Sequence, residues 1–303
     1  MRFFVRRPVA NNNTPPESRG AERHVYQNLR LVDLLHTAHL LSPNFIYVEF
    51  GAGKGGLSHW IHQSLCEKCR DPPLSFHASR TMFFLVDQQS VRYKFDARHR
   101  EDGNFVRLRM DIACLDLKQY ITKNCPSNPV VAVAKHLCGD ATDLTLRCVK
   151  RSLTPELSQG IRFQGILIAL CCHHRCTWEE STGRQWLESN AELTRREFQI
   201  ATRLTSWATC GFRRSNEAGK HDDGEQQNDR DETLSEDDKV DFFNWTNHQR
   251  TVIGRLCKLL IDLGRLNYVK EELRFAHAEL LNYVPANVTP ENLVLLAFND
   301  PPV

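Results

Sequence analysis

Five short, mostly apolar runs recur through the first part of this 303-residue chain, each separated from the next by a longer amphipathic stretch. They cover residues 45–50, 82–86, 105–110, 130–134 and 165–170. Strands that are apolar on both sides are typical of parallel sheets covered by helices on both faces. Two further runs, at 278–284 and 293–298, indicate a closing strand pair. The pattern predicts an α/β fold: a mostly parallel seven-stranded sheet with helices on both faces.

Polar residues follow these runs directly. A glycine-rich loop follows the first run, Asp87 the second, Asp111 the third and Lys135 the fourth. The carboxyl ends of parallel strands meet at one edge of a sheet, and ligands of α/β proteins bind beyond that edge. We therefore expect the functional site there.

Two segments differ in composition from the rest of the chain. Residues 1–20 are rich in Asn and Pro, and residues 215–238 carry ten acidic side chains against Lys220 and Arg230. Such segments hold too little apolar surface to fold. We predict disorder for residues 1–20 and for an acidic insertion at about 215–238, within a single folded domain that spans 21–303.

The net charge of +2 conceals a basic body, because the chain without the acidic insertion carries +10. A basic surface is compatible with phosphate-bearing partners such as nucleic acids. No run approaches the roughly 18 apolar residues of a membrane span, and the N-terminal apolar run is too short for a signal peptide. We expect an intracellular protein with no membrane partner, whose 11 cysteines are reduced thiols.

The loop after the first run reads GxGxG, with glycines at Gly51, Gly53 and Gly55 and an acid, Glu49, two positions earlier. Nicotinamide-binding loops read GxGxxG and place a pyrophosphate at a helix N-terminus. The spacing here suits a cofactor that has no phosphate and carries a cationic amino-acid end. We predict S-adenosylmethionine (SAM), with Glu49 toward its methionine end. A plain tight turn is the alternative.

Acids at the next two strand ends extend this hypothesis. Asp87 would hydrogen-bond the ribose hydroxyls of the cofactor, while Asp111 and Ile112 would hold its adenine. Both aspartates could instead be simple helix caps.

The fourth and fifth runs lead into clusters of Lys, Cys and His. Lys135 and His136 follow one run, and residues 171–176, Cys-Cys-His-His-Arg-Cys, follow the other. Such residues suggest zinc, but adjacent ligands from one short loop strain a tetrahedral site. Cys66 and Cys69 form an isolated CxxC pair. We therefore expect no metal site, and buried thiols instead.

Six blocks of this chain, taken together, closely resemble the eukaryotic tRNA 2′-O-methyltransferase family that modifies position 4 of the acceptor stem. The blocks lie at 48–55, 135–139, 141–144, 168–176, 206–211 and 254–262. They occur in the family's order, and the resemblance runs from about Val25 to Phe298. It covers nearly the whole predicted domain.

The resemblance implies a Rossmann-like class I SAM-dependent methyltransferase that transfers a methyl group to a ribose 2′-hydroxyl of tRNA. A general base for that hydroxyl would come from the strand ends, where the candidates are Lys135, His136, His173 and His174. Arg175, Arg195 and Arg196 are candidates for phosphate contacts. No obligate protein partner is evident. The family's small N-terminal zinc-binding modules are not found here, so we expect a shortened form.

Other functions stay open. The chain could be a SAM-dependent methyltransferase of protein or of another RNA, or a short form that binds SAM or RNA without turnover. A nicotinamide dehydrogenase is disfavoured by the GxGxG spacing.

Overall fold

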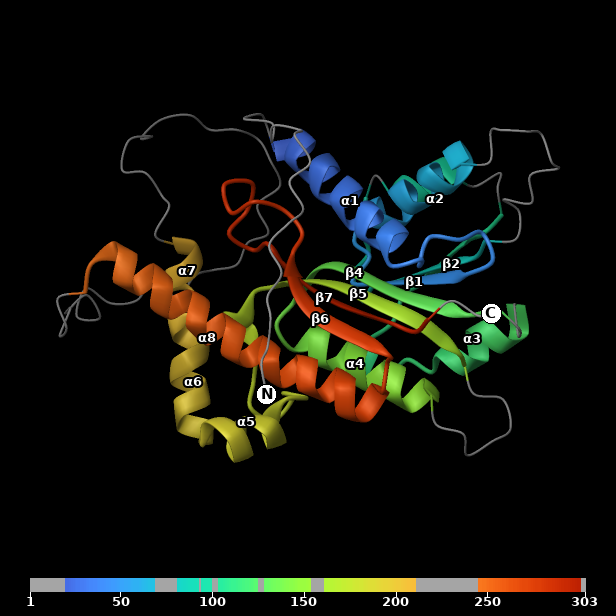
Figure 1. Ribbon diagram of the computed structural model, residues 1–303. Helices are drawn as coiled ribbons and strands as arrows, with labels where there is room; N and C mark the ends of the chain where they lie inside the picture. Colours follow the sequence, from blue (N-terminus) through green and yellow to red (C-terminus); the bar gives the residue numbers. More distant parts are fainter. Residues whose placement is uncertain are drawn as a thin grey trace.

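The computed structural model describes residues 20–68, 81–92, 94–99, 103–124, 128–153, 161–210 and 245–300. Residues 1–19 and the acidic insertion at 215–238, for which the sequence predicts disorder, lie outside the described residues. Figure 1 shows helices on both faces of a central sheet. The helices are α1 (Gly20–Thr37), α2 (Gly56–Lys68), α3 (Leu117–Asn124), α4 (Asp140–Leu153), α5 (Arg184–Ala191), α6 (Arg195–Leu204), α7 (Trp207–Cys210) and α8 (Asn247–Tyr268).

The strands are β1 (Ile46–Phe50), β2 (Phe83–Val86), β3 (Phe105–Leu108), β4 (Val130–Cys138), β5 (Phe163–Cys171), β6 (His277–Asn282) and β7 (Leu293–Phe298). They form a sheet in the order β3-β2-β1-β4-β5-β7-β6, which confirms the predicted α/β architecture with seven strands among the described residues. Strands β1 to β5 pair in parallel, whereas β7 runs antiparallel to both β5 and β6. The sheet is therefore mixed, and the prediction of a mostly parallel sheet is corrected at this end. The loop between β6 and β7 returns the chain directly to its neighbour, without the crossover that a parallel pair needs.

Two apolar layers hold the helices against the sheet. Alternate residues of β1 face opposite layers: Tyr47 lies among apolar side chains of α1 and α2, whereas Val48 lies among those of α3, α4 and α8. All five residues of β1 are buried. Burial on both sides explains why the strands of the sequence are continuous apolar runs.

The strands β1 and β4 are parallel neighbours in the sheet, and the order in which strands are added reverses between them: β2 and β3 extend the sheet beyond β1, and β5 extends it beyond β4. From β1 the chain continues into α2 on one face, and from β4 into α4 on the opposite face. Such a switch point is where open α/β sheets bind their ligands.

Strand β4 is longer than the sequence predicts. The apolar run ends at Ala134, but the strand continues to Cys138 with a register shift between Lys135 and Leu137. His136, at the shift, has a positive φ of 60°. This bulge keeps the polar residues in the strand and redirects their side chains.

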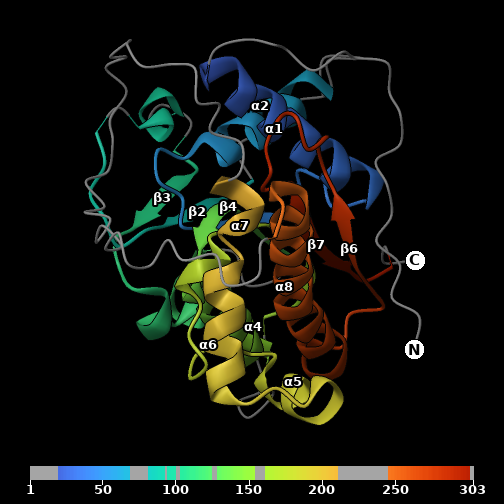
Figure 2. The same cartoon turned by 90° about the vertical axis from the view of Figure 1, so that its left-hand side faces the viewer.

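Helices α5 to α8 form a smaller assembly after β5, with an apolar cluster that includes Trp178, Phe198 and Ile261. In Figure 2, α6, α7 and α8 lie in front of the sheet. Capping boxes at Thr194 and Thr246 fix the starts of α6 and α8. Among the described residues, no helix is long and apolar enough to cross a membrane.

Candidate functional site

The glycine loop after β1 adopts the left-handed backbone that favours glycine. Gly51, Gly53 and Gly55 have φ values of 60°, 49° and 77°. A Cβ on Gly51 would lie 2.7 Å from a methyl carbon of Leu137, so the loop packs closely on β4. A Cβ on Gly53 would meet no described atom beyond its chain neighbours within 4 Å. The outer side of Gly53 therefore leaves room for a ligand.

Two side chains clamp the peptide groups of Gly53. Its N–H donates to Oδ2 of Asp87 over 2.7 Å, and its carbonyl accepts from Nη1 of Arg107 over 2.9 Å. Arg107 is itself held by Asp96, with Nη2 lying 2.9 Å from Oδ1. Asp87, which follows β2, and Arg107, within β3, thus fix the conformation of the loop that follows β1.

Glu49 lies beneath this loop and is 3% exposed. Its Oε2 accepts hydrogen bonds from the backbone N–H and the hydroxyl of Ser58, at 2.9 and 2.5 Å. Burial raises the pKa of Glu49 to about 7, although the bonds from Ser58 and the charge of Arg107 oppose the rise. Glu49 therefore fastens the start of α2 to β1, in addition to any role toward a cofactor.

The third strand end is less closely tied to the loop. Asp111 is the N-cap of the short helix η3 (Ile112–Cys114) and accepts from the N–H of Ala113 over 2.8 Å. This is the helix-cap alternative of the sequence analysis. Ile112 is partly buried against the core, so the adenine role of these two residues stays a prediction.

Lys135 lies beside the glycine loop, because Phe50 pairs with Ala134 at the ends of β1 and β4. Its Nζ donates to the carbonyl of His24 in α1 over 3.2 Å. Burial lowers the pKa of Lys135 to about 8, while the charge of Glu49 acts in the opposite direction. A lysine with this pKa is partly neutral near physiological pH and can accept a proton.

His136 follows at the bulge and its side chain is exposed. Its ring meets that of His24 edge to face, with centroids 5.7 Å apart. Desolvation by the protein around the ring and the adjacent ammonium of Lys135 lower the pKa of His136. The structure therefore places both fourth-strand candidates, Lys135 and His136, next to α1 and close to the glycine loop.

The ends of β4 and β5 bring three thiols together. The Sγ of Cys138 lies 3.7 Å from that of Cys171 and 3.0 Å from that of Cys172. All three sulfurs lie within 4.8 Å of one another, a spacing that could hold a metal ion. The sequence predicts no metal site, and nothing in it indicates that Cys138 lies beside the other two cysteines.

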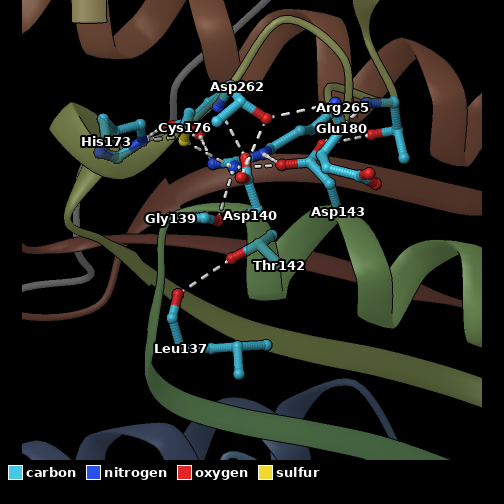
Figure 3. A network of polar contacts seen from close by, with 12 residues as sticks. Leu137, Gly139, Asp140, Thr142, Asp143, His173, Cys176, Glu180, Asp262 and Arg265 are labelled. Carbon is cyan, nitrogen blue, oxygen red and sulfur yellow. Dashed lines mark hydrogen bonds and ion pairs between the residues drawn. The ribbon is translucent and has the colours of Figure 1, made fainter. Parts of the chain in front are cut away.

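A buried network of charged groups lies behind these strand ends (Figure 3). Nη2 of Arg265, from α8, donates to Oδ2 of Asp143 over 2.5 Å and to the carbonyl of Gly139 over 3.2 Å. Nη1 of Arg265 lies 3.1 Å from Oδ1 of Asp262, and Nε2 of His173 lies 2.8 Å from the same carboxylate. Burial alone would raise the pKa of Asp262, but His173 and Arg265 hold it below its usual value.

This network fixes the segment after β5. It joins the helix η4 (His173–Arg175) to α4 and α8, and Arg265 also donates to Sγ of Cys176 over 3.1 Å. His173 is 1% exposed, whereas His174 and Arg175 are exposed. The two histidines of the Cys-Cys-His-His-Arg-Cys block therefore have different roles: one is a structural partner of Asp262 and the other faces solvent.

The family model described as Methyltransferase TRM13 matches residues 26–298, nearly all of the folded chain. The chain belongs to the TRM13 methyltransferase family. It is similar to the tRNA:m(4)X modification enzyme TRM13 homologs of Mus musculus and Homo sapiens, with 33% and 32% identity over 94% and 93% of this chain. The TRM13 protein of Saccharomyces cerevisiae is 28% identical over 93% of the chain. The matched part of each relative is 66%, 66% and 64% of its length, so the chain spans about two thirds of these proteins.

In this TRM13-family chain the predicted site residues fall into two groups. The glycine loop, Glu49, Asp87 and Lys135 lie together at the switch point between β1 and β4. Asp111 and His173 engage in other contacts, as a helix cap and in the buried network. The sequence analysis missed Arg107, Asp143, Asp262 and Arg265. A signal for the last two was their opposite charge and their spacing of three along one helix, which places both on one face.

Proposed function

We propose that this chain is a Rossmann-like class I methyltransferase that transfers the methyl group of SAM to a ribose 2′-hydroxyl at position 4 of the tRNA acceptor stem. The observation that carries the proposal is the switch point between β1 and β4, where the glycine loop and Lys135 share one edge of the sheet. Membership in a methyltransferase family supports the reaction class, and the names of the relatives support tRNA as the substrate.

The residues of the loop fit SAM. The free side of Gly53 allows close approach, and the carboxylates of Asp87 and Glu49 give the surroundings negative charge suited to ribose hydroxyls and to a cationic cofactor. When bound, SAM supplies an activated methyl group on a sulfonium. Asp87 would orient the ribose from the end of β2, and the Arg107 clamp would keep the loop in the binding conformation.

Lys135 is the general base in this proposal. Its partial burial favours the neutral amine, which takes the proton of the attacking hydroxyl while the methyl group is transferred in line. His173 is too deeply buried to touch a substrate, so we assign it a positioning role through Asp262. His136 and His174 are exposed near the same strand ends and remain candidates for substrate contacts.

The exposed side chains after β5 would meet the RNA backbone. Arg175 is exposed at the end of η4, and Arg195 begins α6, where it pairs with Glu179 over 2.7 Å. Phosphate contacts of this kind position a nucleic acid without reading its sequence. Their removal should weaken binding uniformly and reduce its salt dependence.

The deciding experiment is transfer of labelled methyl from SAM to unmodified tRNA, followed by mapping of the modified nucleoside. The proposal predicts a 2′-O-methyl mark at position 4. A mark at another position, or on a base, would refute the site assignment. SAM binding without transfer to tRNA, or transfer to protein, would favour the alternative functions. Because the chain spans two thirds of its relatives, the assay should be run beside a full-length relative as a positive control.

A further inference from the structure

The three thiols at the ends of β4 and β5 come from two separate strands. Cys138 is the last residue of β4, Cys171 is the last residue of β5, and Cys172 follows directly. In the sheet, Cys138 and Cys171 are register partners. Their side chains would therefore be neighbours in any state of the fold, which leaves Cys172 as the residue whose orientation needs an explanation.

Cys172 takes a conformation that costs energy. Its φ of 50° and ψ of 42° lie in the left-handed region, which is unfavourable for a residue with a Cβ. The turn that results brings its sulfur to within 3.0 Å of that of Cys138. Adjacent cysteines usually strain a tetrahedral metal site. Here the left-handed turn at Cys172 avoids that strain, because it brings the sulfurs of Cys171 and Cys172 to the same side, next to that of Cys138.

We propose that Cys138, Cys171 and Cys172 form a three-thiolate site for one Zn²⁺ ion. Zn–S bonds of about 2.3 Å at tetrahedral angles separate the sulfurs by about 3.8 Å. The separation of Cys138 and Cys171, 3.7 Å, matches this value, and that of Cys138 and Cys172, 3.0 Å, needs to open by less than one ångström. Each thiol releases its proton to solvent when the ion binds.

The surroundings favour a closed, structural site. Cys171 is buried, and Cys138 and Cys172 are partly buried, so the ion would be largely shielded by protein. A fourth position would be filled by water or by an imidazole, for which His136 and His174 are the candidates because each lies two residues from a proposed ligand in the sequence. The ion would lock the bulge of β4 to the end of β5, three residues beyond Lys135. This inference does not depend on the proposed function, because metal content is measured without turnover.

The first test measures zinc by mass spectrometry in the chain purified under reducing conditions, and titrates the metal-free chain with Co²⁺. We expect one zinc per chain and a thiolate-to-cobalt charge-transfer band. The variants Cys138→Ser and Cys172→Ser should lose the band and bind at least about 100-fold more weakly. Cys257→Ser is the matched control, because this partly buried thiol lies on α8 outside the cluster and should leave binding unchanged. Circular dichroism shows whether each variant is folded.

A second test needs no variant. Zn²⁺ should protect Cys138, Cys171 and Cys172 of the native chain from alkylation, as read by peptide mapping, while the exposed Cys114 reacts with or without the ion. Three results would overturn the proposal. They are a reduced chain that binds neither ion, protection that maps to other cysteines, and a Cys138–Cys172 disulfide whose reduction does not restore metal binding.

Discussion

Arg265 of α8 and Asp143 of α4 form an ion pair in which each side chain is 1% exposed, with Nη2 and Oδ2 2.5 Å apart. The two residues are 122 positions apart in the sequence. The same guanidinium also reaches Asp262, which in turn holds His173. One buried cation thus joins α4, α8 and the segment after β5, all of which adjoin the strand ends that carry the proposed site.

Replacing this cation should strongly destabilise the fold. In Arg265→Met, the carboxylate of Asp143 stays buried without its cation and that of Asp262 keeps only His173 of its two closest partners. Loss of one partner from a buried pair costs about 3–5 kcal/mol. We expect a drop of this size in the free energy of unfolding, measured by urea denaturation. Lys150→Met is the control, because its pair with Glu272 is exposed at the surface and contributes under about 1 kcal/mol. Equal losses in the two variants would contradict a special role for the buried network.

The general-base assignment predicts a pH profile. The pKa of Lys135, lowered to about 8 mainly by burial, means that the neutral amine becomes more abundant as pH rises through that value. The kcat/KM for methyl transfer, which reports the pKa values of the free enzyme, should therefore increase with pH, with a midpoint near 8, and level off above it.

Lys135→Arg tests the same assignment while keeping the positive charge. Arginine cannot give up its proton in a protein, so kcat should fall by about 10²–10⁴ while SAM affinity stays within a few fold. Lys150→Arg, on the outer surface of α4, should retain full activity. A Lys135→Arg enzyme with the normal rate and the same pH midpoint would show that another group takes the proton.

The glycine loop predicts two different effects of adding a methyl group. Gly51→Ala places a Cβ 2.7 Å from the buried side chain of Leu137, so overpacking of about 1–3 kcal/mol adds to the cost of its positive φ. Gly53→Ala has the backbone cost alone, yet its methyl group projects into the room where SAM is proposed to bind. We expect at least about a tenfold loss of SAM affinity for Gly53→Ala with a smaller loss of stability.

Gly103→Ala is the matched control for this pair. Its φ is 67° and its Cβ would also meet no described atom within 4 Å, but it lies in the loop before β3. The control should share the backbone cost of Gly53→Ala and bind SAM normally. Calorimetry of SAM binding and thermal unfolding separate the two effects, and unchanged affinity in Gly53→Ala would place the cofactor elsewhere.

Much of the sheet was predictable because strands buried on both faces leave continuous apolar runs, as β1 and β5 do. The extension of β4 was not, since Lys135 and His136 interrupt the apolar run. Their place in the strand depends on a bulge that only pairing with β5 stabilises. Local sequence carries no information on that pairing.

The site was predictable to a similar degree. Gly51, Gly53 and Asp87 could be predicted as site residues because each follows shortly after an apolar run. In the structure the N–H of Gly53 donates a hydrogen bond to Asp87. The role of Arg107 could not be predicted, because in the sequence it is only a polar residue inside a mostly apolar strand. Its hydrogen bond to the carbonyl of Gly53 spans 54 positions and depends on the order of the sheet.

The buried carboxyl group of Glu49 predicts a pH-dependent stability. Burial raises its pKa from 4.5 to about 7, so the protonated form favours the folded state. This contribution is fully present below pH 4.5 and is lost as pH rises through 7. The free energy of unfolding of the wild-type chain should therefore fall by about 3 kcal/mol over this range relative to that of Glu49→Gln. The amide of this variant does not titrate, and its side-chain carbonyl can still accept hydrogen bonds from Ser58.

Urea denaturation of both chains at a series of pH values measures this difference. Glu197→Gln is the control, because the hydrogen bonds from Thr194 lower the pKa of this exposed carboxyl, and its contribution is lost only as pH falls below its usual range. Above pH 4.5 the stability curve of Glu197→Gln should run parallel to that of the wild type, because the contribution of Glu197 is constant there. Parallel curves for the wild type and Glu49→Gln would mean that Glu49 remains ionised when buried, held by Arg107 and Ser58 against the cost of desolvation.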